Sequence, residues 1–252
     1  YQPAQPESTE EPKGADQPES AEEPKSADQH ESAEQAQPQQ AAPAAAPAAP
    51  TLVNGKGNGF FGNTITVINK VANTVLNLTL RDVKIDVSDE DEKTALRVQG
   101  DGNVEIELDG NNELKSGKGR AGLEKTSTGT LTLKDDNKDG SLKATGGANG
   151  AGIGGSMNNG TNKITIKGGT VEAKGGLYAA GIGGGGEDIT IKGGRVTATG
   201  GDYGAGIGGG SGGSGKNITI NGGTVNATGT DGGAGIGGGS GSSCLLYTSD
   251  AA

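Results

Sequence analysis

Four near-copies of one six-residue block recur in the second half of the chain and constrain its fold more than any other feature. GAGIGG occupies residues 150–155, 204–209 and 233–238, and AAGIGG occupies residues 179–184. The isoleucines of these blocks, at positions 153, 182, 207 and 236, are 29, 25 and 29 residues apart. Such a period is typical of solenoids, in which residues one period apart lie directly above one another. The spacing therefore predicts a stack of coils whose side chains form columns.

A second shared block precedes the hexapeptide in the later coils. ITIKGGTVEA begins at residue 164, ITIKGGRVTA at residue 189 and ITINGGTVNA at residue 218. Each block alternates apolar and polar residues on both sides of a Gly-Gly pair, which is the period of a strand with one buried face. We therefore predict three short strands in each coil, I-T-I, T-V-x-A and A-G-I, with glycines at the corners because glycine adopts a positive φ at little cost.

The same pattern continues upstream in a less regular form. Its alignment with the later blocks predicts one column of apolar residues, one from each coil: Leu80, Leu108, Leu133, Ile166, Ile191 and Ile220. The steps along this column are 28, 25, 33, 25 and 29 residues, which predicts six coils. Residues 64–68 (TITVI) are either a capping strand or part of a further incomplete coil.

These patterns predict an all-β fold, a right-handed parallel β-helix of about six coils with three short strands in each. Helices are disfavoured after residue 50, because that part holds 50 of the 51 glycines and shows no sustained apolar spacing of 3.6 residues. Propeller blades need about 40 residues and four strands, more than one repeat offers here. Parallel strands connected in one sense favour the right-handed form.

The composition divides the chain into three parts. Residues 1–50 contain all nine prolines, with ten acidic and two basic residues. A segment with few apolar groups and a high net charge cannot bury enough surface to offset the entropy of ordering, so we predict a disordered tail and spacer. Residues 51–243 form the predicted repeat domain. Residues 244–252 break the repeat and resemble translated sequencing-adapter sequence, so we interpret them as a non-native tail.

Three longer blocks carry a resemblance to a known family. They are ELDGNNELKSGKGRAGLEK from residue 107, ITIKGGTVEAKGG from residue 164 and AAGIGGG from residue 179. These blocks resemble the repeat region of bacterial surface and secreted proteins grouped as carbohydrate-binding-domain-containing proteins. The resemblance covers about residues 75–240 and implies a right-handed parallel β-helix. It also implies binding of plant-type acidic polysaccharide with the help of calcium, at the surface of a cell or outside it.

Residues 135–140 (DDNKDG), inserted between the first two strands of their coil, are the best candidate for a metal site. Asp135, Asn137 and Asp139 have the alternate spacing that directs several oxygens of one short loop toward a hard cation such as Ca²⁺. Position twelve of that loop pattern is Gly146 rather than glutamate, so further ligands would come from neighbouring coils or water. The alternative is a polar turn without a metal, since Asp, Asn and Gly are turn formers.

The candidate carbohydrate-binding residues are two tyrosines and two lysines. Tyr178 and Tyr203 each precede the isoleucine of their coil by four residues, so they should stack at one corner as a two-step platform for the apolar faces of sugar rings. The alternative is that the tyrosines only cover each other. Lys167 and Lys192 should share another column and face an acidic polysaccharide, unless they serve only solubility. Other cations with the same potential role are Arg120, Lys143 and Arg195.

Other function classes have little support in the sequence. GAGIGG matches the dinucleotide pattern G-x-G-x-x-G, but no helix is expected after it, so we predict no nucleotide binding. Residues 51–243 have no basic excess, which disfavours nucleic acid. The only histidine, His30, lies in the predicted tail, and no serine or cysteine has a plausible base partner, so we predict no enzyme activity. No membrane-spanning segment is visible.

We therefore predict a non-catalytic polysaccharide-binding module of a secreted or cell-surface bacterial protein, assisted by calcium and favouring acidic glycans. Attachment to a cell wall would come from regions outside this chain. The main alternative is a structural stalk of an adhesin that presents other modules. A β-helical polysaccharide lyase or hydrolase is the least favoured option, because no pair of carboxylates is marked out.

Overall fold

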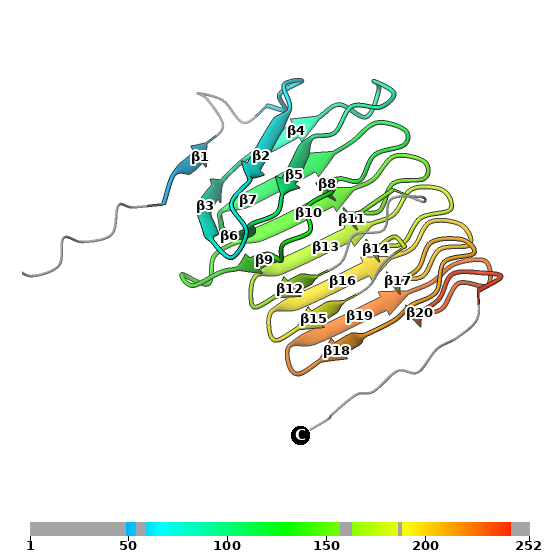
Figure 1. Cartoon of the computed structure of the whole chain (residues 1–252). Coiled ribbons are helices and arrows are strands. Elements are labelled where there is room, and N and C mark those ends of the chain that lie inside the picture. The colour runs from blue at the N-terminus through cyan, green and yellow to red at the C-terminus, as the bar shows by residue number, and fades with distance from the viewer. Residues whose placement is uncertain (1–48, 54–58, 157–162, 186–187, 243–252) are drawn as a thin grey trace, which may run out of the picture. The chain divides into compact units, whose positions relative to one another are not determined.

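Three parallel β-sheets form the walls of a solenoid. The computed structural model describes residues 49–53, 59–156, 163–185 and 188–242, and the chain passes through the three sheets in the same order in every coil (Figure 1). We name the sheets A, B and C in that order. The predicted disordered tail, apart from Ala49 and Pro50, and the predicted non-native tail 244–252 lie outside the described residues. The described ranges contain no helix, and hence no helix that could span a membrane.

The strands of each sheet follow one another along the stack. Sheet A contains β1 (Thr51–Val53), β3 (Val75–Arg81), β6 (Asn103–Asp109), β9 (Leu131–Lys134), β12 (Ile164–Ile166), β15 (Ile189–Ile191) and β18 (Ile218–Ile220). Sheet B contains β4 (Lys84–Asp86), β7 (Asn111–Lys115), β10 (Ser141–Thr145), β13 (Thr170–Lys174), β16 (Arg195–Thr199) and β19 (Thr224–Thr228). Sheet C contains β2 (Ile65–Asn69), β5 (Leu96–Gly100), β8 (Leu123–Lys125), β11 (Ile153–Gly154), β14 (Ile182–Gly183), β17 (Ile207–Gly208) and β20 (Ile236–Gly237).

Six coils with all three strands result, from coil 1 (β3, β4, β5) to coil 6 (β18, β19, β20). The predicted parallel β-helix of about six coils with three strands in each is confirmed. An incomplete coil precedes them, because β1 pairs with β3, Phe61 bridges to Ile85 and β2 pairs with β5. Residues 64–68 therefore belong mainly to β2 of a further incomplete coil, one of the two predicted possibilities.

The predicted apolar column is correct from coil 3 onward, and Leu80 pairs with Leu108 as predicted, but the step from Leu108 to Leu133 is wrong. In the structure Ile106, not Leu108, pairs with Leu133, and Leu78 pairs with Ile106. A shift of two residues keeps every side chain on the same face of a strand, so alternation alone could not exclude it. Leu108 instead lies beneath the turn that contains Gly140, whose added Cβ would come within 2.3 Å of the carbonyl oxygen of Leu108.

The core is a set of aliphatic columns along the inside of the three sheets. Ile166 and Ile191 are fully buried and pair in register, and Ile191 pairs in turn with Ile220. Sheet B contributes buried valine and alanine, as in Val171 and Ala173, both 1% exposed. Parallel strands that lie about 4.8 Å apart bring such side chains into van der Waals contact, so each coil covers the apolar surface of the one before it.

The glycine that follows the isoleucine in β11, β14, β17 and β20 has a steric role. Gly154, Gly183, Gly208 and Gly237 have φ values between 124° and 135°, which L side chains rarely adopt. A Cβ on Gly183 would lie 2.2 Å from the carbonyl oxygen of Gly208, and one on Gly208 would lie 1.9 Å from that of Gly237. The recurring glycine of the GIGG block is therefore required because the backbone of the next coil occupies the place of a side chain.

The outer face of sheet B carries a column of alternating charge. Its members, in the order of the coils, are Lys84, Glu113, Lys143, Glu172, Thr197 and Asn226. The Nζ atom of Lys143 lies 3.2 Å from a carboxylate oxygen of Glu172. Opposite charges on adjacent strands stabilise a sheet modestly, whereas like charges directly opposite each other destabilise it.

We expect Gly183→Ala to lower the free energy of unfolding by about 3 kcal/mol or more, because the methyl group meets backbone atoms that cannot move independently of the stack. Gly212→Ala is the matched control, since Gly212 also has a positive φ (72°) but no atom within 4 Å of its added Cβ. The control should lose only about 1 kcal/mol. Denaturant unfolding followed by circular dichroism measures both, and equal losses would contradict the steric explanation.

Candidate functional site

The corner between sheets B and C contains a column of residues with left-handed backbone. One residue per coil has a φ between 60° and 91° there: Glu92, Gly119, Asn149, Tyr178, Tyr203 and Gly232. The amide of Asn149 donates to the carbonyl oxygen of Leu177 (2.7 Å), and the amide of Tyr178 donates to that of Asp202 (3.0 Å). With the equivalent bonds of Glu92 and Gly119, these bonds join the corners of coils 1 to 4 to the next coil. We call the six residues the left-handed column.

Tyrosine is an unusual occupant of this column. Asn149 and Gly232, in the neighbouring coils, adopt a positive φ readily, whereas a bulky side chain is disfavoured there by about 1 kcal/mol or more. Tyr178 and Tyr203 nevertheless have φ values of 67° and 65°. Such residues cluster at binding and active sites, where the strain is retained for a function. The two tyrosines are therefore the strongest candidate for a functional site in the described part of the chain.

The two rings stack, as their spacing predicted. Their centroids are 5.7 Å apart and their planes differ by 15°, and the residues are 38% and 42% exposed. The sequence suggested a platform with both rings open to a polymer, but this stacking covers one face of each ring with the other ring. Each ring keeps one outer face and its edge for a ligand. The binding of a sugar by Tyr178 and Tyr203 stays a prediction.

Two glycine-rich loops fix the backbone of the tyrosines. The amide of Ser211 donates to the carbonyl oxygen of Tyr178 (2.9 Å), and the amide of Ser240 donates to that of Tyr203 (2.8 Å). Each loop follows the sheet C strand of the coil next to its tyrosine. Sequence reasoning missed these contacts, because the loops themselves are irregular and only the fold brings them to this corner.

The predicted lysine column exists but lies apart from the tyrosines. The amide of Lys192 donates to the carbonyl oxygen of Ile166, which places Lys192 directly above Lys167 at the corner between sheets A and B. Strand β13 separates Lys167 from Tyr178, and five residues of strand span roughly 17 Å. The four predicted carbohydrate-binding residues thus form two separate groups at opposite ends of the sheet B strands.

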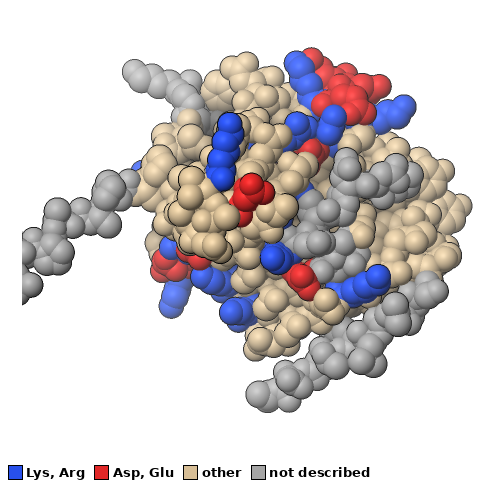
Figure 2. Space-filling view, viewed as in Figure 1, with Lys and Arg blue, Asp and Glu red and all other residues tan. Residues whose placement is uncertain are grey.

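Most of the candidate cations already have acidic partners. The Nζ atom of Lys167 lies 3.0 Å from Oε1 of Glu105, and Nη2 of Arg120 lies 2.7 Å from Oε2 of Glu92. Figure 2 shows acidic and basic side chains beside one another in several separate groups on a visible face that is otherwise mostly uncharged. For Lys192, no ion pair is found within the ranges that the structure describes. The pairs neutralise Lys167, Arg120 and Lys143 of the five candidate cations.

The loop 135–140 uses one of its carboxylates to hold its own shape. Oδ1 of Asp135 accepts hydrogen bonds from the amides of Asp139 (3.2 Å) and Gly140 (3.1 Å), the arrangement of a polar turn. Asp136 is paired with Lys134. In the part of the chain that the structure describes, no three His, Cys, Asp or Glu side chains are grouped to hold a metal ion. Calcium binding by Asp135, Asn137 and Asp139 stays a prediction.

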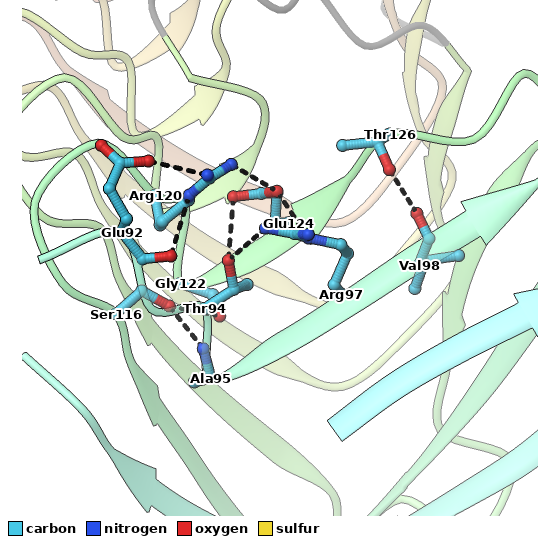
Figure 3. Close-up of polar contacts among 10 residues, drawn as sticks. All are labelled: Glu92, Thr94, Ala95, Arg97, Val98, Ser116, Arg120, Gly122, Glu124 and Thr126. Atoms are coloured by element: carbon cyan, nitrogen blue, oxygen red, sulfur yellow. Dashed lines mark hydrogen bonds and ion pairs between the residues drawn. The ribbon is translucent and has the colours of Figure 1, made fainter. Parts of the chain in front are cut away.

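A polar cluster centred on the buried Glu124 lies in coils 1 and 2, where the corner between sheets B and C leads into sheet C (Figure 3). Glu124, only 2% exposed, lies 2.8 Å from Nε of Arg97 and 3.6 Å from Nη1 of Arg120. The hydroxyl of Thr94 donates to its other carboxylate oxygen (3.2 Å). The charges of this cluster are paired with one another across coils 1 and 2, so it offers no unpaired charge to a ligand.

Lys125 is a lysine inside the solenoid. It is fully buried opposite Val98 in sheet C, and its Nζ donates to the carbonyl oxygen of Ser127 (2.6 Å). Burial lowers the pKa of Lys125 from 10.5 to about 8, and the positive charge of Lys163 acts in the same direction. Strand alternation from Leu123 places residue 125 inside, but a lysine is normally outside, so the sequence analysis missed it.

A family model described as a beta helix repeat matches residues 138–157, 164–186, 189–211 and 218–240. The last three segments begin at β12, β15 and β18 and run past the sheet C strand of the same coil, so the repeat unit is one coil. A search of curated proteins gave no significant match, and neither did a search of solved structures. The match supports the parallel β-helix and carries no information about a ligand.

We expect Lys125→Met to stabilise the protein by roughly 2 kcal/mol at pH 7, because the charged amine is expensive to bury and only one hydrogen bond is lost. Between pH 8 and 10.5 the unfolded chain keeps a proton that the folded chain has released, so the stability of the unsubstituted protein rises with pH. The advantage of the variant should therefore shrink by roughly 2–3 kcal/mol between pH 7 and 10.

Urea unfolding of both proteins at the two pH values measures this difference directly. Lys118→Met is the control. It also replaces a lysine by methionine, but Lys118 is exposed in the turn between β7 and β8 and is not part of the core column of Lys125. An advantage of Lys125→Met that stays constant from pH 7 to 10 would contradict the lowered pKa.

Proposed function

We propose that this chain is a non-catalytic polysaccharide-binding module of a secreted or cell-surface protein. The observation that carries the proposal is the stacked pair Tyr178 and Tyr203, which are 38% and 42% exposed at backbone positions that disfavour large side chains. Aromatic rings bind the apolar faces of sugar rings, and a rigid scaffold that holds them in place reduces the entropy lost on binding. This corner offers two partly exposed aromatic rings on a scaffold of hydrogen-bonded coils.

An acidic ligand is not part of the proposal. The sequence suggested one through Lys167, Lys192 and further cations, but Lys167 and Arg120 have carboxylate partners. Lys143 also pairs, with Glu172. Exposed cations that are already neutralised contribute little to the attraction of a polyanion. Lys192 and Arg195, for which no ion pair is found among the described residues, lie at the corner between sheets A and B, away from the tyrosines.

A structural stalk is the second candidate function. It is favoured by the unbroken register of three sheets over six coils and by the ion pairs that join neighbouring coils, such as Lys143 with Glu172. In a stalk the two tyrosines would serve only to brace coils 4 and 5 at their corner. The two functions differ in one measurable respect, because only a binding module retains a polysaccharide.

We expect the double variant Tyr178→Ala/Tyr203→Ala to lose at least about tenfold in affinity for a polysaccharide that the unsubstituted chain binds, because each stacked ring contributes on the order of 1 kcal/mol. Affinity gel electrophoresis over a panel of soluble polysaccharides measures the retention. The variant should stay folded and lose only the ring contact, about 1 kcal/mol, because alanine keeps the Cβ and with it the strain of a positive φ.

Phe60→Ala is the matched control for this experiment. Phe60 is 44% exposed and lies in the incomplete first coil, where its ring contacts the Nζ atom of Lys115. Its removal should leave retention unchanged. If no polysaccharide is retained by the unsubstituted chain, the stalk replaces the binding module as the proposed function.

Calcium assistance is a separate part of the proposal and rests on the oxygen-rich loop 135–140. We expect titration calorimetry to show uptake of one Ca²⁺ per chain, and Asp139→Asn to weaken it at least about tenfold, because a ligand charge is removed. Asp202→Asn, which removes an equal charge at another corner, is the control. Absence of binding heat would assign the loop to the turn that Asp135 already stabilises.

A further inference from the structure

The two stacked tyrosines do not have equivalent surroundings. Tyr178 covers one face of Tyr203, and the opposite face of Tyr203 is turned toward coil 6. The position directly above Tyr203 is Gly232, because an added Cβ on the following glycine, Gly233, would lie 2.1 Å from the carbonyl oxygen of Gly204. On the other side of the pair, Tyr178 faces coil 3, whose residue in the column is Asn149. Only the upper side of the pair therefore faces a residue without a side chain.

Gly232 places no side chain over Tyr203, and Tyr203 is 42% exposed. An added Cβ at Gly232 would meet only the side chain of Ser240, at 3.1 Å from Oγ and 3.5 Å from Cβ. Ser240 is itself bonded through its amide to the carbonyl oxygen of Tyr203. The ring face, the glycine and the serine thus surround one location at the corner of coils 5 and 6.

The charged residues that adjoin Tyr203 and Gly232 in the chain are both acidic. Asp202 directly precedes Tyr203, and Asp231 directly precedes Gly232 and is exposed. Asp231 is the only charged residue of coil 6 within the described residues 218–242. The basic side chains of coil 5, Lys192 and Arg195, lie at the corner between sheets A and B. Carboxylates accept hydrogen bonds from hydroxyl groups but repel the carboxylates of an acidic glycan.

We propose that the outer face of Tyr203, the open position at Gly232 and the carboxylate of Asp231 form a subsite for one sugar ring of a neutral polysaccharide. This inference rests on the proposed function and specifies its ligand class. The apolar face of the sugar stacks on Tyr203, and its hydroxyl groups donate hydrogen bonds to Asp231. The polymer continues outward from the corner, so a single ring, and not two successive rings, contacts the aromatic pair.

The test combines a substitution that fills the subsite with a choice of neutral and acidic probes. Gly232→Asn places in coil 6 the residue that coil 3 already carries at the same position of the column, Asn149, with a φ of 66°. The full chain and the variant are compared by affinity gel electrophoresis with three neutral probes, hydroxyethylcellulose, galactomannan and xyloglucan, and with two acidic probes, polygalacturonate and alginate. We expect retention by at least one neutral probe, and an affinity for it about tenfold lower in Gly232→Asn.

Gly119→Asn is the matched control, because Gly119 belongs to the same column and has a φ of 83° but lies two coils below Tyr178. An added Cβ there meets only the end of the Glu92 side chain, so the control tests the effect of asparagine at this backbone position without touching the tyrosines. It should bind the neutral probe as the unsubstituted chain does. Asp231→Asn should also weaken neutral binding, because an amide is a weaker acceptor than a carboxylate.

The outcomes separate this inference from the proposed function. Retention by acidic probes alone overturns the neutral subsite and leaves the polysaccharide-binding module in place. Neutral retention that is equal in Gly232→Asn and in the unsubstituted chain overturns the location of the subsite. Retention by none of the five probes, with the melting temperatures unchanged, overturns both proposals.

Discussion

The backbone hydrogen bonds from each coil to the next are the interaction on which the rest of this structure depends. Strands of two residues, such as β14 and β17, could not persist as an isolated pair. They persist here because each is bonded on both sides within a sheet of seven strands. The same bonds fix the register, and the register decides which side chains meet, from the pairing of Ile166 with Ile191 to the close approach of Gly183 to Gly208.

The register also creates the candidate site and sets its limits. It brings Tyr178 and Tyr203 together although they are 25 residues apart in sequence, and it holds both in a backbone conformation that suits glycine and asparagine better. The same register sends Lys167 and Lys192 to the opposite corner. In the chain, Asp202 and Asp231 adjoin the tyrosine corner and those lysines do not, and the proposed preference for a neutral glycan rests on this difference.

The sequence predicted most of the fold and part of the site, for physical reasons that differ between residues. In coils 4 to 6 the Gly-Gly pairs and the GIGG blocks permit only one alignment of the three repeats with one another. The columns of Ile166 and of Tyr178 could therefore be derived. Leu108 was misplaced because a shift of two residues preserves strand alternation. Lys125 and the partners of Arg120 could not be foreseen, since burial of a charged group depends on neighbours that only the three-dimensional stack supplies.

The alternating charges on sheet B favour the correct stacking order of the coils during folding. Coils of similar sequence can stack on the wrong neighbour, but omission of one coil would place Lys84 against Lys143, or Glu113 against Glu172, with like charges opposed. Thr197 and Asn226 provide no such discrimination in coils 5 and 6. Misassembly and exchange of coils between two chains should therefore concentrate at the C-terminal end, where the repeats are also most alike.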